Sequence, residues 1–157
     1  MAATTSLDQG HRGRHPAAAA EPEHPGAQSG HLNGLAWCTL PTEESAVPQA
    51  RAFTETHLAA WRIDGEMSDA TRLAVSEFVT NSVCHSGSAD VTLRLIRCGS
   101  QVRVEVIDGG VWRESDPSGP GDDIAEGGRG LALVSVLAQR FGVHRTSFGT
   151  CVWALLR

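Results

Sequence analysis

Residues 77–85 have the sequence EFVTNSVCH and lie inside a longer run with helical spacing. Glu77, Asn81 and His85 are four residues apart, and each such step turns by only about 40° around an α-helix, so the three side chains share one stripe. The apolar residues beside the stripe predict that the same side of the helix is buried. A carboxylate, a carboxamide and an imidazole beside a buried face cost free energy unless something there needs them. We therefore expect this helix to carry a functional site.

Hydrophobic periodicity on either side of this helix predicts the other elements. Ser45 and Ser68 are expected to cap two helices, because a serine before a helical pattern can accept hydrogen bonds from the first turn. The expected elements are a strand at 35–40, a helix from Ser45 to about 62, a helix at 69–85, strands at 91–96 and 102–107, a helix at 130–141, and a hairpin of 144–147 and 150–156. Helices that segregate to one face of a mainly antiparallel sheet make an α+β two-layer sandwich.

The first 34 residues differ from the rest of the chain. They contain three prolines, a run of four alanines and almost no large apolar residues. Such a segment cannot bury enough surface to offset its ordering entropy, so residues 1–34 are predicted to be disordered and residues 35–157 to form the domain. The chain has no long apolar run, so we expect neither a signal peptide nor a membrane anchor. We therefore expect a cytoplasmic protein.

Composition excludes several kinds of function. The chain has 157 residues and a net charge of −5, which argues against general nucleic-acid binding. Its thirteen basic residues are all arginines, and without lysine it cannot form a lysine-dependent phosphate loop. The four cysteines have no Cys-x-x-Cys spacing, so we expect reduced thiols at small apolar positions rather than a metal centre.

Two further features of the sequence could bind part of a ligand. Asp108 continues the parity of the buried valines at a strand end and is followed by Gly109 and Gly110, so its carboxylate could accept a hydrogen bond from an exocyclic amine. The segment 127–130, Gly-Gly-Arg-Gly, opens a predicted helix, where backbone N–H groups and the helix dipole favour an anion. Each feature alone has a simpler explanation, because strand-end aspartates form turns and glycines at helix starts serve simple turns.

Taken together, in this order and spacing, the motifs resemble the ATPase fold of the GHKL superfamily, which is shared by gyrase, histidine kinases and MutL. More narrowly, they resemble the small bacterial anti-sigma-factor serine/threonine kinases and their actinobacterial relatives. The resemblance covers nearly all of residues 35–157. It rests on the helix motif at 77–85, Asp108-Gly109-Gly110, Gly-Arg-Gly-Leu at 128–131, and Gly149-Thr150.

The resemblance implies roles for the helix motif. Asn81 matches the asparagine that binds Mg²⁺ between the ATP phosphates. Glu77 matches the acid that acts as general base toward the attacking hydroxyl. His85 matches a commonly polar position, and a structural histidine at the helix end explains it equally well.

The resemblance also implies a nucleotide pocket. Asp108 matches the aspartate that recognises adenine, and Gly110 matches the glycine that lets the base approach. The other matching positions are Gly128 and Gly130 on the phosphate side, Arg129 toward phosphate or a partner protein, Leu131 in the same motif, and Gly149 with Thr150 near the adenine pocket. The sequence departs from the family at Trp112, where another glycine is usual, and in the acid-rich loop expected at 111–128.

The leading functional interpretation is an ATP- and Mg²⁺-dependent serine/threonine-protein kinase that sequesters a sigma factor and phosphorylates an anti-anti-sigma partner of the STAS type. A homodimer is implied by the same resemblance. The alternative is a nucleotide-dependent regulatory protein without kinase activity, which the departures in the loop favour. A histidine-kinase catalytic domain would need a helical segment carrying a phosphoacceptor histidine, and a gyrase-like motor would need a transducer domain. The sequence supplies neither.

Overall fold

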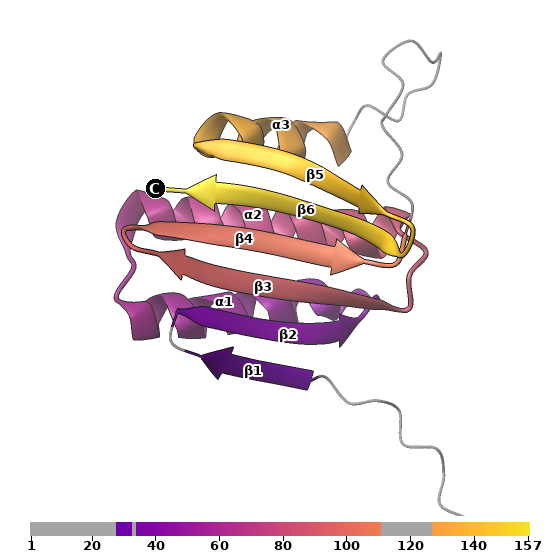
Figure 1. Cartoon of the computed structure of the whole chain (residues 1–157), viewed down its shortest axis with the longest axis horizontal. Coiled ribbons are helices and arrows are strands. Elements are labelled where there is room, and N and C mark those ends of the chain that lie inside the picture. Colours follow the sequence, from indigo (N-terminus) through magenta and orange to yellow (C-terminus); the bar gives the residue numbers. More distant parts are fainter. Residues whose placement is uncertain (1–27, 33, 111–126) are drawn as a thin grey trace, which may run out of the picture.

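The computed structural model describes residues 28–32, 34–110 and 127–157, and its strands form one antiparallel sheet (Figure 1). The sheet has six strands in the order β1-β2-β3-β4-β6-β5. The strands are β1 (Gln28–Leu32), β2 (Leu35–Pro41), β3 (Asp90–Cys98), β4 (Gln101–Asp108), β5 (Arg140–Thr146) and β6 (Gly149–Leu156), and the helices are α1 (Ala46–Trp61), α2 (Gly65–His85) and α3 (Gly127–Leu137). The predicted α+β sandwich is confirmed.

The core lies between the sheet and the helices; in the view of Figure 1, α1 and α2 lie behind the sheet and α3 lies at its β5 edge. Alternate residues of β2 and β6 are buried, as expected for strands with one covered face. The α2 side chains Val75, Phe78 and Val79 are almost fully buried in one cluster with the strand valines. The apolar side of α2 therefore holds the helix on the sheet and fixes the direction of its polar stripe.

The predicted start of α2 is wrong by one turn. The helix begins at Gly65, with Asp64 in the N-cap position, and Ser68 is buried inside the helix. The half-buried Met67 packs against the core, so apolar burial continues the helix before the expected cap. Ser45 occupies the N-cap position of α1 as predicted, but its hydroxyl makes no capping bond and instead accepts one from Gln49 Nε2 at 3.1 Å.

The predicted helix at 130–141 is also wrong at both ends. Helix α3 begins at Gly127 and ends at Leu137, and Arg140 already starts β5. Phe141 packs on Phe78 with ring centroids 6.0 Å apart, and Gly142 lies beneath the ring of Trp153. Pairing with β6 therefore determines the conformation of this segment. The predicted loop at 111–128 lies outside the described residues except for 127 and 128, which are helical.

Strand β1 corrects the predicted domain boundary. Residues 28–32, which were expected to be disordered, pair with β2, and the ring of Trp37 lies directly over Gly30. The expectation for residues 1–27 lies outside the described part of the chain. No helix in the described residues is long and apolar enough to span a membrane.

Candidate functional site

The first half of the site is the contact between α2 and the start of α3. A methyl group at Gly130 would overlap the Glu77 carboxylate, well inside the 3.0 Å that real side chains keep, so a side chain there would displace the carboxylate. The half-buried Leu131 packs against the core and holds this end of α3 in place, whereas Arg129 is exposed. Gly128 lies in the first turn of α3, whose N–H groups have no partner within the helix and favour an anion.

The second half of the site surrounds the carboxylate of Asp108 at the end of β4. Its Oδ2 accepts a hydrogen bond from the hydroxyl of Ser82 on α2, and its Oδ1 accepts one from Gly110 N at 2.9 Å. The buried hydroxyl of Thr150 on β6 donates to the carbonyl oxygen of Gly110 at 3.0 Å. The carboxylate therefore faces the helix layer, as its parity predicted. Each of its oxygens keeps a lone pair for a further donor.

Two glycines of this half are required by close packing. A methyl group at Gly110 would overlap the backbone of Ser86, at the C-terminal end of α2. Gly149 has a φ of 146°, a backbone conformation that residues with a side chain rarely adopt, and a methyl group there would overlap the carbonyl oxygen of Asp108. These glycines bring β4, β6 and the end of α2 into direct contact around the Asp108 carboxylate.

Asn81 connects the two halves along α2. It is half-buried, one turn after Glu77 and next to Ser82, so it lies between the contact with α3 and the contact with Asp108. His85 is exposed in the last turn of α2 and does not share the partly buried environment of Glu77 and Asn81. The two interpretations of His85 given by the sequence, a polar position of the motif and a structural histidine at the helix end, therefore stay predictions.

Ser82 was missed by the sequence reasoning. Its hydroxyl is buried, and it is the donor that links α2 to Asp108. The sequence could have indicated Ser82 through Asp108, because strand alternation places Asp108 on the buried face of its strand. A carboxylate that faces a buried layer needs a donor, and a serine next to the polar stripe of the helix is a suitable one.

Two of the four cysteines, Cys38 and Cys151, are held as neutral thiols. Burial raises the pKa of the Cys38 thiol to about 11, and burial, followed by the negative charge of Glu105, raises the pKa of Cys151. Both thiols are therefore protonated near neutral pH. All four cysteines are free, and Cys84 and Cys98 are exposed, which corrects the expectation that all of them fill apolar positions.

Comparisons with known proteins match this arrangement. The family model described as a histidine kinase-like ATPase domain matches residues 40–156, which include every residue of both halves. A solved structure of the RsbU and RsbW domains of Rv1364c from Mycobacterium tuberculosis is similar, with a TM-score of 0.62 and 25% sequence identity. The similarity covers 78% of the present chain and 32% of that one, so the present chain matches about a third of its length. A search of curated proteins gave no match.

Proposed function

The chain belongs to the histidine kinase-like ATPase domain family, and from this premise we propose that it is an anti-sigma-type regulator that transfers phosphate from ATP to a serine or threonine of a partner protein. The observation that carries the proposal is the position of the Glu77 carboxylate against the first turn of α3. This position places a proton acceptor beside a backbone anion site. The proposed partners are a sigma factor and an anti-anti-sigma protein of the STAS type.

The residues of the site fit ATP. The remaining lone pairs of the Asp108 carboxylate suit the exocyclic amine of adenine. The first turn of α3, with Gly128 and Gly130, offers backbone N–H groups to the phosphates. ATP supplies the phosphoryl group that is transferred, and these residues would orient it.

Magnesium fits Asn81. No group of three histidine, cysteine or acidic side chains that could hold a metal occurs in the described part of the chain. Mg²⁺ usually keeps several waters and takes its other ligands from phosphates and one or two protein oxygens. The half-buried carboxamide of Asn81 would be such a ligand, and the ion would compensate the phosphate charge.

Glu77 would act as the general base. Its carboxylate would accept the proton of the partner hydroxyl while that oxygen attacks the terminal phosphate. The first turn of α3 faces this carboxylate with the positive end of the helix dipole.

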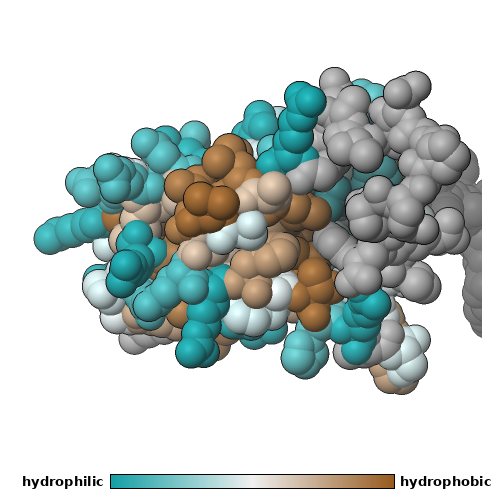
Figure 2. Space-filling model, turned by 90° about the horizontal axis from the view of Figure 1, so that it is seen from above, coloured by the Kyte–Doolittle hydropathy of each residue, from teal (hydrophilic) through white to brown (hydrophobic). Residues whose placement is uncertain are grey.

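A partner protein would find an apolar surface on α3. Leu133, Val136 and Leu137 are 49%, 80% and 47% exposed, and Figure 2, which looks down on the side of the molecule where α3 lies, shows apolar residues gathered there. Exposed apolar patches commonly mark protein-binding sites. The patch lies on the C-terminal half of α3, and Leu133 lies about one turn after Gly130, so a partner bound there would be on the same helix as the proposed phosphate end.

The test is phosphotransfer from radiolabelled ATP to candidate STAS-domain proteins. The Glu77→Gln variant should bind Mg-ATP like the wild type but lose phosphotransfer by at least about a hundredfold, the usual contribution of a general base. Glu66→Gln, which changes an exposed glutamate in the first turn of the same helix, is the matched control and should keep full activity. Equal rates for the Glu77 variant and the control would rule out the proposed role.

A second candidate function is a nucleotide-dependent binding switch without kinase activity. Trp112 in place of a glycine and the five acids between residues 114 and 126 favour it, because neither feature suits a triphosphate. Tight Mg-ATP binding by the wild type without transfer to any STAS partner would select this second function.

A further inference from the structure

The outer side of α3 carries a stripe of apolar side chains. Leu133, Val136 and Leu137 are 49%, 80% and 47% exposed, at the i, i+3 and i+4 spacing that gathers side chains on one side of a helix. The inner side of the helix holds Val134, which is buried, and Leu131, which packs against the core. The three exposed side chains therefore form a stripe that no described part of the chain covers.

An arginine lies at each end of this stripe. Arg129 is exposed in the first turn of α3, one turn before Leu133, so it lies on the same side of the helix. Arg140 is exposed at the start of β5, three residues after Leu137, which places the two Cα atoms within about 11 Å of each other. We call these two arginines and the three apolar residues the α3 surface.

The α3 surface lies in a part of the chain that has no acidic residue. Residues 127–157 contain four of the thirteen arginines and none of the eighteen aspartates and glutamates, although the chain as a whole has a net charge of −5. Figure 2 shows hydrophilic side chains beside the apolar area on this side of the molecule. The α3 surface is therefore a basic region of an acidic protein, and its field attracts acidic groups.

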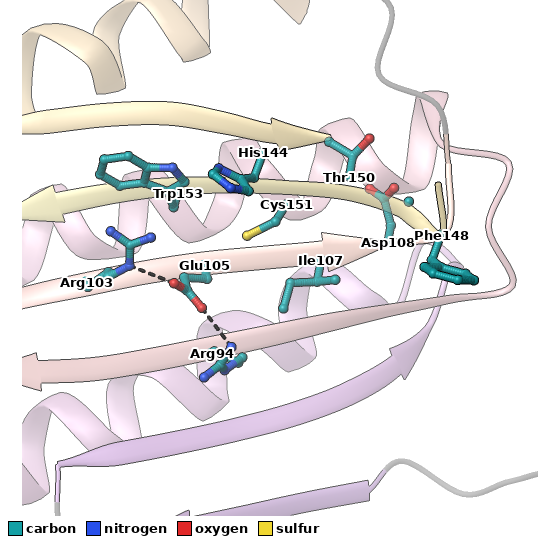
Figure 3. Close-up of a pocket in the computed structure, with 11 residues that line it drawn as sticks. Arg94, Arg103, Glu105, Ile107, Asp108, His144, Phe148, Thr150, Cys151 and Trp153 are labelled. Carbon is teal, nitrogen blue, oxygen red and sulfur yellow. Dashed lines mark hydrogen bonds and ion pairs between the residues drawn. The ribbon is translucent and has the colours of Figure 1, made fainter. Parts of the chain in front are cut away.

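The two arginines of the α3 surface differ from those on the open face of the sheet. Arg94 and Arg103 both pair with Glu105, at 3.0 and 2.6 Å, and are held by it (Figure 3). Arg129 and Arg140 take part in no ion pair with another described residue. Because charges at the rim of an apolar contact select the partner, these two arginines favour a partner with acids at matching positions.

We propose that the α3 surface docks an amphipathic helix of a partner protein whose apolar stripe has acidic residues at both ends. The apolar side chains of that helix would pack on Leu133, Val136 and Leu137 as ridges in grooves, and its acids would pair with Arg129 and Arg140. Eight residues of helix separate Arg129 from Leu137, a rise of about 12 Å, so the acids of the partner helix should be about three turns apart.

Other occupants fit the α3 surface less well. A second copy of this surface would bring its arginines against the same arginines, and like charges repel. A single-stranded nucleic acid would need aromatic side chains for stacking, whereas the exposed apolar residues of α3 are all aliphatic. An anionic membrane takes up helices with a broad apolar face and aromatic anchors, which the eleven residues of α3 do not have.

The inference deepens the proposed function, because it assumes that the chain acts on a partner protein and names the chemistry of that partner's docking helix. The resemblance left two roles for Arg129, toward phosphate or toward a partner protein, and the α3 surface assigns it to the partner. Docking on this surface requires neither ATP nor phosphotransfer, so it can be measured without either.

The test is a selection of phage-displayed helical peptides on the immobilised full chain. The library fixes a leucine stripe at i, i+3, i+4 and i+7, and varies glutamate, lysine and alanine at both ends of the stripe. Glutamate should be enriched at both ends. The selected peptides should bind Val136→Asp at least about tenfold more weakly, because a carboxylate then lies within the stripe. Enrichment of lysine or alanine, or equal binding by Val136→Asp, would overturn the proposal.

Charge reversal tests the two ends of the α3 surface separately, with fluorescence anisotropy of one selected peptide. Arg129→Glu and Arg140→Glu should each weaken binding at least about fivefold. Lysine at one end of the peptide should restore binding to Arg140→Glu, and lysine at the opposite end should restore binding to Arg129→Glu. Arg62→Glu, an exposed arginine after α1, is the control and should bind like the wild type. An equal loss in the control, or no restoration by lysine, would contradict the pairing.

Two further measurements separate the alternatives. Val136 lies outside the proposed ATP site, so Val136→Asp should lose the peptide and still bind Mg-ATP. Peptide binding by a chain that does not bind Mg-ATP would support the docking helix and refute only the proposed ATP site. A wild type that binds Mg-ATP but no peptide, or that binds phosphatidylglycerol vesicles in place of the peptide, would overturn the docking proposal alone.

Discussion

At the residue scale, Ser82 holds the adenine side of the proposed site together, because its hydroxyl donates to Asp108 from a buried position on α2. Ser82→Ala should lower the free energy of unfolding by about 1–2 kcal/mol, since a partly buried carboxylate oxygen loses its donor. Urea denaturation measures this loss. Ser135→Ala on α3, which removes an exposed hydroxyl bonded to a backbone carbonyl, is the control and should be nearly neutral. Equal losses in the two variants would contradict the assigned role.

Gly130 tests the contact between Glu77 and α3. Alanine is favoured over glycine in a helix by about 1 kcal/mol, but here its methyl group would displace the Glu77 carboxylate. Gly130→Ala should therefore be less favourable for stability in the wild type than in a Glu77→Ala background, with a coupling of about 0.5–3 kcal/mol. A double-mutant cycle from denaturation curves gives the coupling. A coupling of zero would mean that the two residues do not touch.

Because the Cys38 thiol is buried, we expect the free energy of unfolding to change at high pH. Its pKa is raised to about 11 in the folded chain from an ordinary value of 9.0, so the unfolded chain loses this proton first as the pH rises. The contribution of the neutral thiol to the free energy of unfolding is fully present below pH 9 and is lost between about pH 9 and pH 11. The free energy of unfolding should fall across this window, and the fall should be smaller in Cys38→Ala. Identical slopes in both chains would contradict the burial of this thiol.

The placement of single residues was the best predicted part of the candidate site. The four-residue spacing placed Glu77 and Asn81 on one side of α2, and strand parity turned Asp108 toward the helices. Sequence could not supply Ser82 as the partner of Asp108. That contact depends on where the end of β4 meets α2, which is set by packing between segments 26 residues apart.

At the element scale, alternation predicted β2, β3, β4 and β6 to within two residues at each end, because each has one buried and one open face. The helix predicted at 130–141 was correct through Leu137 but was extended too far, because a short apolar run fits a helix or a buried strand equally well. Strand β1 was missed because its sequence, QSGHL, has no apolar alternation. Its place depends on Trp37, whose ring needs a glycine on the neighbouring strand.

The contribution of β1 can be measured by truncation. A chain lacking residues 1–32 loses the pairing of β1 with β2 and the contact between Gly30 and the Trp37 ring. Its free energy of unfolding should be about 1–3 kcal/mol lower than that of a chain lacking residues 1–27. Urea denaturation of the two truncated chains makes the comparison. Equal midpoints would mean that β1 does not contribute to the domain.

At the scale of the whole molecule, the fold has two surfaces of different character. The helix side brings α2, α3 and the end of β4 together around the proposed ATP site, and the open side of the sheet carries the ion pairs of Glu105 with Arg94 and Arg103. Because the strands alternate, β4 contributes to both: Asp108 faces the helices and Glu105 faces away. The sequence predicted the first surface through its motifs. The second depends on the register of β3 with β4, which no local pattern contains.

The central claim is that α2 and the end of β4 form an ATP site, and calorimetric titration of the full chain with Mg-ATP tests it most directly. The wild type should bind, and Asn81→Ala and Asp108→Ala should each weaken binding by at least about tenfold, because each removes a contact to a charged or metal-bound group. Asp69→Ala, which removes an exposed carboxylate far along the same helix, should bind like the wild type. Unchanged affinity in both site variants would contradict the claim.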